Sequence, residues 1–106
     1  MDAALRAIAE PSRRRILALV RTQELSAGEI AAYFDVSRPA ISQHLTVLKE
    51  AGLLSERRDG TRRLYRAVPE ALGELKSFLE EFWDDRLAAL KRVAERKERT
   101  NHGRRR

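Results

Sequence analysis

The sequence predicts a mainly α-helical domain with one small β-hairpin. Residues 26–52 read as two short helices joined by a tight turn, and residues 53–68 read as two arginine-rich strands around a glycine-containing turn. Apolar side chains also recur at helical spacing before and after this segment. The second helix of such a pair fits the major groove of DNA, and a basic hairpin reaches neighbouring phosphates. We therefore expect a winged helix–turn–helix of five helices and a two-stranded wing.

The first two helices are expected before residue 21. The first covers residues 2–9, with Leu5 and Ile8 on one face. The second begins at Pro11, where the missing N–H of proline costs nothing. Three arginines follow at 13–15. We interpret them as a solvated face, with contact between one of them and a phosphate as the alternative.

The third and fourth helices form the helix–turn–helix. Ser26 and Glu29 have the spacing of a capping box, which opens the third helix. Ser37 is expected to cap the fourth helix, and Gly52 to end it. The buried stripe of the fourth helix is expected at positions i, i+4 and i+7. These positions are Ile41, Leu45 and Leu48.

The hairpin follows directly. Strands are expected at 53–58 and 62–68, on either side of Asp59-Gly60, a pair that favours a tight hairpin turn. Both strands are short and rich in arginine, so we expect a projecting wing and not a core sheet.

Pro69 opens the last helix, whose apolar periodicity continues to about Arg96. We expect one DNA-binding and dimerisation domain over residues 1–97. Residues 98–106 are expected to be a basic, disordered tail because they are poor in apolar side chains.

Composition excludes several classes of protein. A chain of 106 residues forms a small core and often relies on a partner subunit. It has no Cys, which excludes disulfides, thiolate metal sites and a cysteine nucleophile. The first ten residues lack the apolar core of a signal peptide, and no stretch approaches the roughly 20 apolar residues that cross a bilayer. We expect a soluble cytoplasmic protein that does not enter a membrane.

The formal net charge of +6 is unevenly distributed along the chain. Residues 38–66 carry 7 basic and 3 acidic side chains, whereas residues 67–90 carry 2 basic and 6 acidic ones. Residues 91–106 add 8 basic and 2 acidic side chains. A basic helix and hairpin followed by an acidic segment favour an oriented anionic partner more strongly than the total charge does.

The fourth helix and the hairpin supply the candidate DNA-contacting residues. Gln can bind adenine through two hydrogen bonds, Arg can bind guanine, and Ser and Thr can meet bases or phosphates. The alternative is that these are ordinary solvated residues, or a wing kept soluble by charge, but their place in the motif favours DNA contact. Arginine near a narrow minor groove also gains from its negative potential. The candidates are Ser37, Arg38, Pro39, Ser42, Gln43, His44, Thr46, Arg58, Arg62 and Arg63.

His44 has two main interpretations. Contact with a phosphate or a base is favoured, and a structural hydrogen bond is the alternative. A metal ligand or general base is disfavoured because no second His, Cys or carboxylate forms a constellation with it. The sequence shows no nucleophile–base pair, phosphate-binding loop or metal cluster elsewhere, so we do not expect an enzyme.

The last helix has more apolar surface than so small a chain buries alone. We expect it to form a dimer interface together with the first helix; the alternative is that its aromatic side chains complete the monomer core. Two-fold symmetry also suits a pseudo-palindromic operator. The expected interface residues are Leu5, Ile8, Phe78, Leu79, Phe82, Trp83, Leu87 and Leu90.

Four segments together resemble the ArsR (arsenic-repressor-like) winged helix–turn–helix transcriptional regulators. They are AEPSRRRIL, ELSAGEIA, SRPAISQHLTVLKEAGLL and RRDGTRRLYR, and the resemblance runs from about residue 3 to 95. It implies five helices with a two-stranded wing, dimerised through the first and last helices. It also implies a homodimer that binds an operator, usually as a repressor released by an inducer. Residues 37–39 and 42–44 match the recognition segment of the family.

The resemblance does not extend to metal sensing. Metal-sensing members carry two cysteines in the segment that here covers residues 24–28, which has none. Another metal site of the family uses Asp and His on the last helix. Here Asp84 is followed by Asp85 and Arg86, and no His appears before His102. Two aspartates alone are weak zinc ligands, so the resemblance is to the non-metal-sensing, autorepressor-like members, with no metal and no cofactor.

We therefore expect a sequence-specific, homodimeric repressor that binds double-stranded DNA at a pseudo-palindromic operator. The alternative is a winged-helix protein-interaction module without specific DNA binding, which the arginine-rich wing disfavours. A small-molecule inducer is compatible with this function, but the sequence does not identify one.

Overall fold

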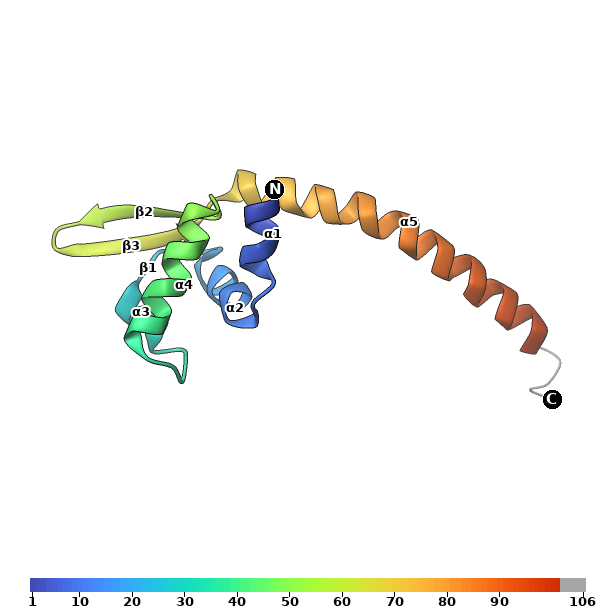
Figure 1. Cartoon of the computed structure of the whole chain (residues 1–106), viewed down its shortest axis with the longest axis horizontal. Coiled ribbons are helices and arrows are strands. Elements are labelled where there is room, and N and C mark those ends of the chain that lie inside the picture. Colours follow the sequence, from blue (N-terminus) through green and yellow to red (C-terminus); the bar gives the residue numbers. More distant parts are fainter. Residues whose placement is uncertain (102–106) are drawn as a thin grey trace. The chain divides into compact units, whose positions relative to one another are not determined.

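The computed structural model describes the backbone of residues 1–101, and the side chains of this range other than 83–88 and 97–101. The chain divides into two compact units, residues 1–75 and residues from 76 onward. Figure 1 shows the elements in chain order. They are α1 (Asp2–Ile8), α2 (Pro11–Val20), β1 (Leu25–Ser26), α3 (Ala27–Ala31), α4 (Arg38–Glu50), β2 (Leu54–Asp59), β3 (Arg62–Ala67) and α5 (Pro69–Asn101).

The helices of the first unit begin at the residues that their sequence signals predict. Pro11 occupies the first turn of α2. The Ser26 hydroxyl accepts a hydrogen bond from the Glu29 amide at 3.1 Å, and the Glu29 carboxylate accepts one from the Ser26 amide at 2.9 Å, which confirms the capping box. Ser37 caps α4 by accepting from the amide three residues on, at 3.2 Å. Beyond α4, Gly52 adopts a φ of +80°, a conformation that favours glycine.

The core of the first unit lies between these helices and the base of the sheet. The predicted stripe of α4 is buried, and Leu75 from the first turns of α5 joins the same cluster. Fully burying one such side chain contributes roughly 1.5–3 kcal/mol. The largest fully buried side chains are Ile16, Val20, Ile30, Ile41, Leu48 and Leu53.

The sheet has three strands in the order β1-β3-β2, and not the two that the sequence predicts. The extra strand is β1, in which Leu25 pairs with Tyr65 and Ser26 pairs with Leu64. Two residues are too few to show an alternating pattern, which explains why the sequence does not reveal this strand. The pairing joins the middle of β3 to the start of α3.

The hairpin turn lies one residue later than predicted. Asp59 pairs with Arg62, so the two loop residues are Gly60 and Thr61. Gly60 has a φ of +65° and no other residue of this loop has a positive φ. A positive φ at the first loop position alone is the pattern of a type II′ turn, which matches the twist of the strands.

The arginines after Pro11 do more than cover a solvated face. Arg13 and Arg14 donate hydrogen bonds to carbonyl oxygens at the end of α1, at 2.6 and 2.8 Å. Arg15 donates to the Tyr33 carbonyl at 3.2 Å, and its guanidinium lies 4.4 Å from the centre of the Phe34 ring. The last carbonyls of a helix have no partner within the helix, so α1 gains from these donors.

In the second unit, α5 continues to Asn101 and thus extends four residues into the segment expected to be disordered. Its first two residues are Glu98 and Arg99, which favour helices, and it contains no Gly or Pro before Gly103. Residues 102–106 lie outside the described residues, and the division at residue 97 stays a prediction. No helix of the described chain is both long enough and apolar enough to cross a membrane.

Candidate DNA-binding surface

The outward face of α4 carries exposed polar side chains. Ser42, Gln43 and Thr46 are exposed, and together with Val47 they line a shallow depression of the surface. Gln43 makes no hydrogen bond to any described residue, so its amide can bind the edge of a base. The Thr46 hydroxyl donates to the Ser42 carbonyl at 3.0 Å and can still accept a hydrogen bond.

The first turn of α4 holds three more of the predicted contact residues. The Ser37 hydroxyl is engaged by the helix cap, and Pro39 is exposed. The Arg38 guanidinium lies beside Gly28 of α3, 3.6 Å from the position that a Cβ would take there. Arg38 forms no ion pair with any described residue, so its charge is open to an anion.

The His44 ring points into the protein. Arg13 lies 3.4 Å from its Nδ1, and Glu10 Oε2 lies 3.7 Å from its Nε2. Because a guanidinium can only donate, Nδ1 must accept, and a neutral ring then carries its proton on Nε2, toward Glu10. Glu10 Oε2 is buried and has no hydrogen-bond partner among the described residues. The His44 side chain is only 20% exposed, which favours the structural interpretation of this residue.

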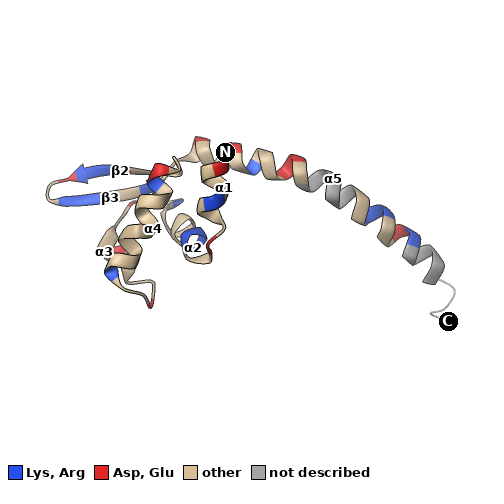
Figure 2. Ribbon diagram, viewed as in Figure 1, with Lys and Arg blue, Asp and Glu red and all other residues tan. Residues whose placement is uncertain are grey.

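Two arginines of the hairpin lie directly opposite each other. Arg58 of β2 pairs with Arg63 of β3, so their side chains share one face of the hairpin. Like charges at such a position destabilise a hairpin by themselves, and Arg58 has no ion-pair partner in the described part of the chain. Figure 2 shows the basic residues on both strands. This arrangement is expected where an anionic partner binds.

On the opposite face of the hairpin, two arginines pair with carboxylates of residues that lie outside the hairpin. Arg57 binds Glu24 through two hydrogen bonds, at 2.8 and 2.9 Å, and Arg62 binds Glu29 of α3 at 2.5 Å. The hydrogen bond from Arg57 holds the pKa of Glu24 below its ordinary value and raises the pKa of Arg57. The pKa of Glu29 is lowered by its hydrogen bonds with Ser26 first, and then by Arg62.

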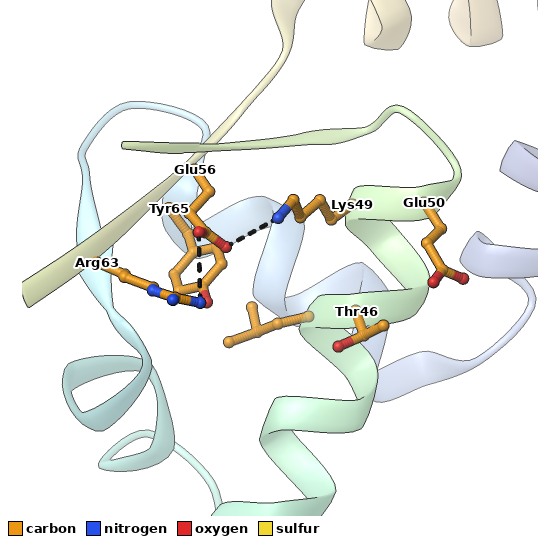
Figure 3. Close-up of a pocket in the computed structure, with 7 residues that line it drawn as sticks. Thr46, Lys49, Glu50, Glu56, Arg63 and Tyr65 are labelled. Atoms are coloured by element: carbon orange, nitrogen blue, oxygen red, sulfur yellow. Dashed lines mark hydrogen bonds and ion pairs between the residues drawn. The ribbon is translucent and has the colours of Figure 1, made fainter. Parts of the chain in front are cut away.

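A third carboxylate lies between α4 and the hairpin. Glu56 of β2 accepts a hydrogen bond from Lys49 at 3.2 Å and lies 3.6 Å from Arg63 (Figure 3). The hydrogen bond from Lys49 lowers the pKa of Glu56, although partial burial opposes the shift. Burial raises the pKa of the neighbouring Tyr65, and the Glu56 charge adds to this effect.

The expected dimer-interface residues fall into three groups. Trp83 and Leu87 lie outside the described side chains. Leu5 and Ile8 are half-buried against the core of the first unit. The remaining four are on α5 and are exposed within the second unit: Phe78 at 40%, Leu79 at 39%, Phe82 at 55% and Leu90 at 62%.

No cluster of three or more His, Cys, Asp or Glu residues that could hold a metal ion occurs among the described residues. The side chains of Asp84 and Asp85, and all of His102, lie outside that part of the chain.

The comparisons with known proteins place this chain in a family. Residues 10–56 match the family described as "Bacterial regulatory protein, arsR family". A protein named as an HTH-type transcriptional regulator of Mycobacterium tuberculosis is 45% identical over 82 residues, which span 77% of each chain. The chain belongs to the arsR family. It is therefore a DNA-binding transcriptional regulator and not an enzyme.

Two further relatives of this arsR-family chain are also described as transcriptional regulators. The transcriptional repressor SdpR of Bacillus subtilis is 43% identical over 60 residues, which cover 57% of this chain and 67% of that protein. A crystal structure described as a possible transcriptional regulator for arsenical resistance has a TM-score of 0.72 and 44% identity, and the match covers 84% of this chain and 95% of that one. The winged-helix prediction is thereby confirmed.

The acidic partners of the hairpin are the residues that the sequence does not reveal. Glu29 is visible as a capping residue, but its ion pair with Arg62 joins positions 33 residues apart. Glu24 and Arg57 are equally distant in the chain. For Glu56 the strand register gives a usable signal, because it places this residue opposite Tyr65 and on the same face of the hairpin as Arg58, two residues away.

Proposed function

We propose that this arsR-family repressor binds its operator with α4 in the major groove and the β2–β3 hairpin against the adjacent backbone and minor groove. The observation that carries this proposal is the exposed Gln43 on the outward face of α4, which has no partner among the described residues. The like-charged pair of Arg58 and Arg63 on the hairpin supports it, since an anionic backbone would relieve their repulsion.

The predicted contact residues then divide by role. Ser42, Gln43 and Thr46 meet base edges, because they lie on the outward face of α4. His44 positions α4 through its ring contacts with Arg13 and Glu10. The remaining residues contact the backbone or the minor groove: Ser37, Arg38, Pro39, Arg58, Arg62 and Arg63.

The decisive test is Gln43→Ala, measured on the operator that the protein selects from fragments of its own genome. We expect a loss of roughly 1–3 kcal/mol on the operator and a much smaller loss on random DNA. Gln23→Ala is the matched control, because Gln23 is exposed after α2 and donates only to the Leu19 carbonyl. Equal losses on both DNAs would assign Gln43 to backbone contact and contradict the proposal.

The repressor acts as a homodimer through α5. Phe78, Leu79, Phe82 and Leu90 are spaced so that they share one face of this helix, and exposed apolar patches of this kind mark partner surfaces. A two-fold dimer would present two α4 helices to half-sites about one helical turn, roughly 34–36 Å, or a multiple of it apart.

Leu90→Glu tests the dimer by sedimentation equilibrium. We expect a wild-type dimer at micromolar concentration, and a shift toward monomers in the variant because it places a charge in the apolar interface. Lys91→Glu is the control, since it places a carboxylate on the other side of the same helix. A wild-type monomer with full operator affinity would refute the dimer.

The absence of Cys from the chain supports the non-metal-sensing subtype, because thiolate sites of the family cannot form. The repressor then uses no metal or other cofactor, and any inducer would be a small molecule of unassigned chemistry.

A further inference from the structure

A cavity of about 320 Å³ lies between the second half of α4 and the hairpin. Figure 3 shows Lys49 from α4 and Arg63 from β3 converging there on Glu56. Each cation uses a different oxygen: Lys49 Nζ lies 3.2 Å from Oε2, and Arg63 Nη1 lies 3.6 Å from Oε1. The carboxylate therefore occupies the space between two cations in the way a bound anion would.

Burial differs sharply across this cluster. The Glu56 side chain is 19% exposed, whereas Lys49 and Arg63 are 51% and 58% exposed. The two cations therefore keep most of their surface toward solvent. Thr46 lines the same cavity, and Arg58 lies on the same face of the hairpin as Arg63. An anion arriving from solvent would thus meet a guanidinium and an ammonium.

We propose that this cavity binds a phosphate of the DNA backbone, and that Glu56 is an internal counter-ion that competes with this phosphate for Lys49 and Arg63. The inference rests on the proposed placement of α4 in the major groove and the hairpin at the minor groove. The backbone between two adjacent grooves must then pass between these elements, where the cavity lies. Ammonium and guanidinium groups are the usual phosphate partners.

The consequence is a lower affinity for every DNA sequence. Lys49 and Arg63 must share or leave Glu56 before they neutralise a phosphate fully, so part of the gain from counterion release is lost. Backbone contacts carry no sequence information. Glu56 therefore weakens the component of binding that operator and random DNA have in common.

The test is Glu56→Gln, which removes the charge and keeps the size and the accepting oxygen of the side chain. We expect random duplex DNA to bind about two- to tenfold more tightly, the range for one or two exposed ion pairs that need not be broken. The slope of log affinity against log salt should steepen by about one to two, because two cations become available. Fluorescence anisotropy over a salt series measures both quantities.

Glu50→Gln is the matched control. Glu50 lines the same cavity and makes no ion pair with a described residue, so this variant changes the net charge equally without releasing a cation. Its gain in affinity should be smaller than that of Glu56→Gln. The double variant Glu56→Gln/Arg63→Ala should lose the gain, because a freed cation is then missing.

Three results would overturn the inference: equal gains in the two single variants, no gain in Glu56→Gln, or a gain that persists in the double variant. Calorimetry with inorganic phosphate separates the DNA backbone from a free anion. We expect no saturation of the wild type below millimolar phosphate, and micromolar binding would assign the cavity to a free anionic ligand instead. If Gln43→Ala discriminates operator from random DNA while Glu56→Gln has no effect, only this inference fails.

Discussion

α4 and the β2–β3 hairpin are held in place by different forces. Three apolar side chains of α4 are buried in the core, whereas its outward Gln43 has no internal partner among the described residues. In the hairpin, by contrast, most of the basic side chains near the tip are bound to carboxylates from within the chain. The proposed base-reading helix is thus anchored by burial and open to a ligand, while the hairpin arrives at DNA with much of its charge already compensated.

The difference between α4 and the hairpin corresponds to two properties of a repressor, its sequence preference and its affinity for any DNA. Base contacts set which sequence is preferred, and phosphate contacts set how tightly any sequence is held. Buried apolar anchoring keeps α4 rigid, which favours discrimination. Exposed ion pairs contribute little to stability, so they can exchange partners when the duplex arrives.

The largest effect is expected from removing an anchor of α4. Leu48 is fully buried, so Leu48→Ala should lower the free energy of unfolding by roughly 2–5 kcal/mol through lost burial and the cavity left behind. Chemical denaturation measures it. Glu24→Gln, which breaks an exposed ion pair, serves as the comparison and should change stability far less. Similar losses in both variants would contradict the claim that α4 is anchored by apolar burial, whereas the ion pairs of the hairpin contribute little to stability.

The next effect concerns the hairpin. The double variant Arg58→Ala/Arg63→Ala should weaken binding to all duplexes and reduce the salt slope by about one to two, because Arg58 neutralises a phosphate fully and Arg63, which is shared with Glu56, does so in part. Arg21→Ala is the control, since Arg21 is exposed directly after α2. An unchanged slope would place this face of the hairpin away from the backbone.

A smaller effect is expected from acid. Glu24, Glu29 and Glu56 have pKa values below their ordinary value of 4.5. A carboxyl group with a depressed pKa stabilises the fold above its unfolded pKa, and that stabilisation is lost as the pH falls through the folded pKa. Stability should therefore decrease below about pH 4.5, and replacing all three residues with Gln should flatten the decrease. Parallel curves for wild type and triple variant would contradict this.

The smallest effect is expected from metals. Operator binding should not respond to a chelator or to stoichiometric zinc, arsenite or cadmium, because the chain lacks cysteine ligands. Anisotropy with the operator and calorimetry with each metal provide the measurement. Tight stoichiometric binding with release of DNA would assign a metal-sensing role to this repressor.

The sequence predicts those features that depend on neighbouring residues. The capping box, the Pro11 start, the stripe of α4 and the Gly52 stop all act within one or two helical turns, so local spacing is enough to find them. The β1 strand and the ion pairs of Glu24 and Glu29 join residues more than 30 positions apart. Their existence depends on how the hairpin docks, which no local pattern encodes. His44 is a further case, because its ring contacts Arg13 of α2 and Glu10, the residue before α2.

One side chain of α2 connects three helices. The Arg13 guanidinium donates to the carbonyl oxygens of Ala7 and Arg6 in α1, at 2.6 and 3.3 Å, and lies 3.4 Å from the His44 ring of α4. A guanidinium can do this because its donors point in several fixed directions, whereas a lysine ammonium is a single point charge on a flexible stem. Arg13→Lys would therefore keep the charge but lose donors that join α1 to α4, so the exchange is conservative in charge and not in structure.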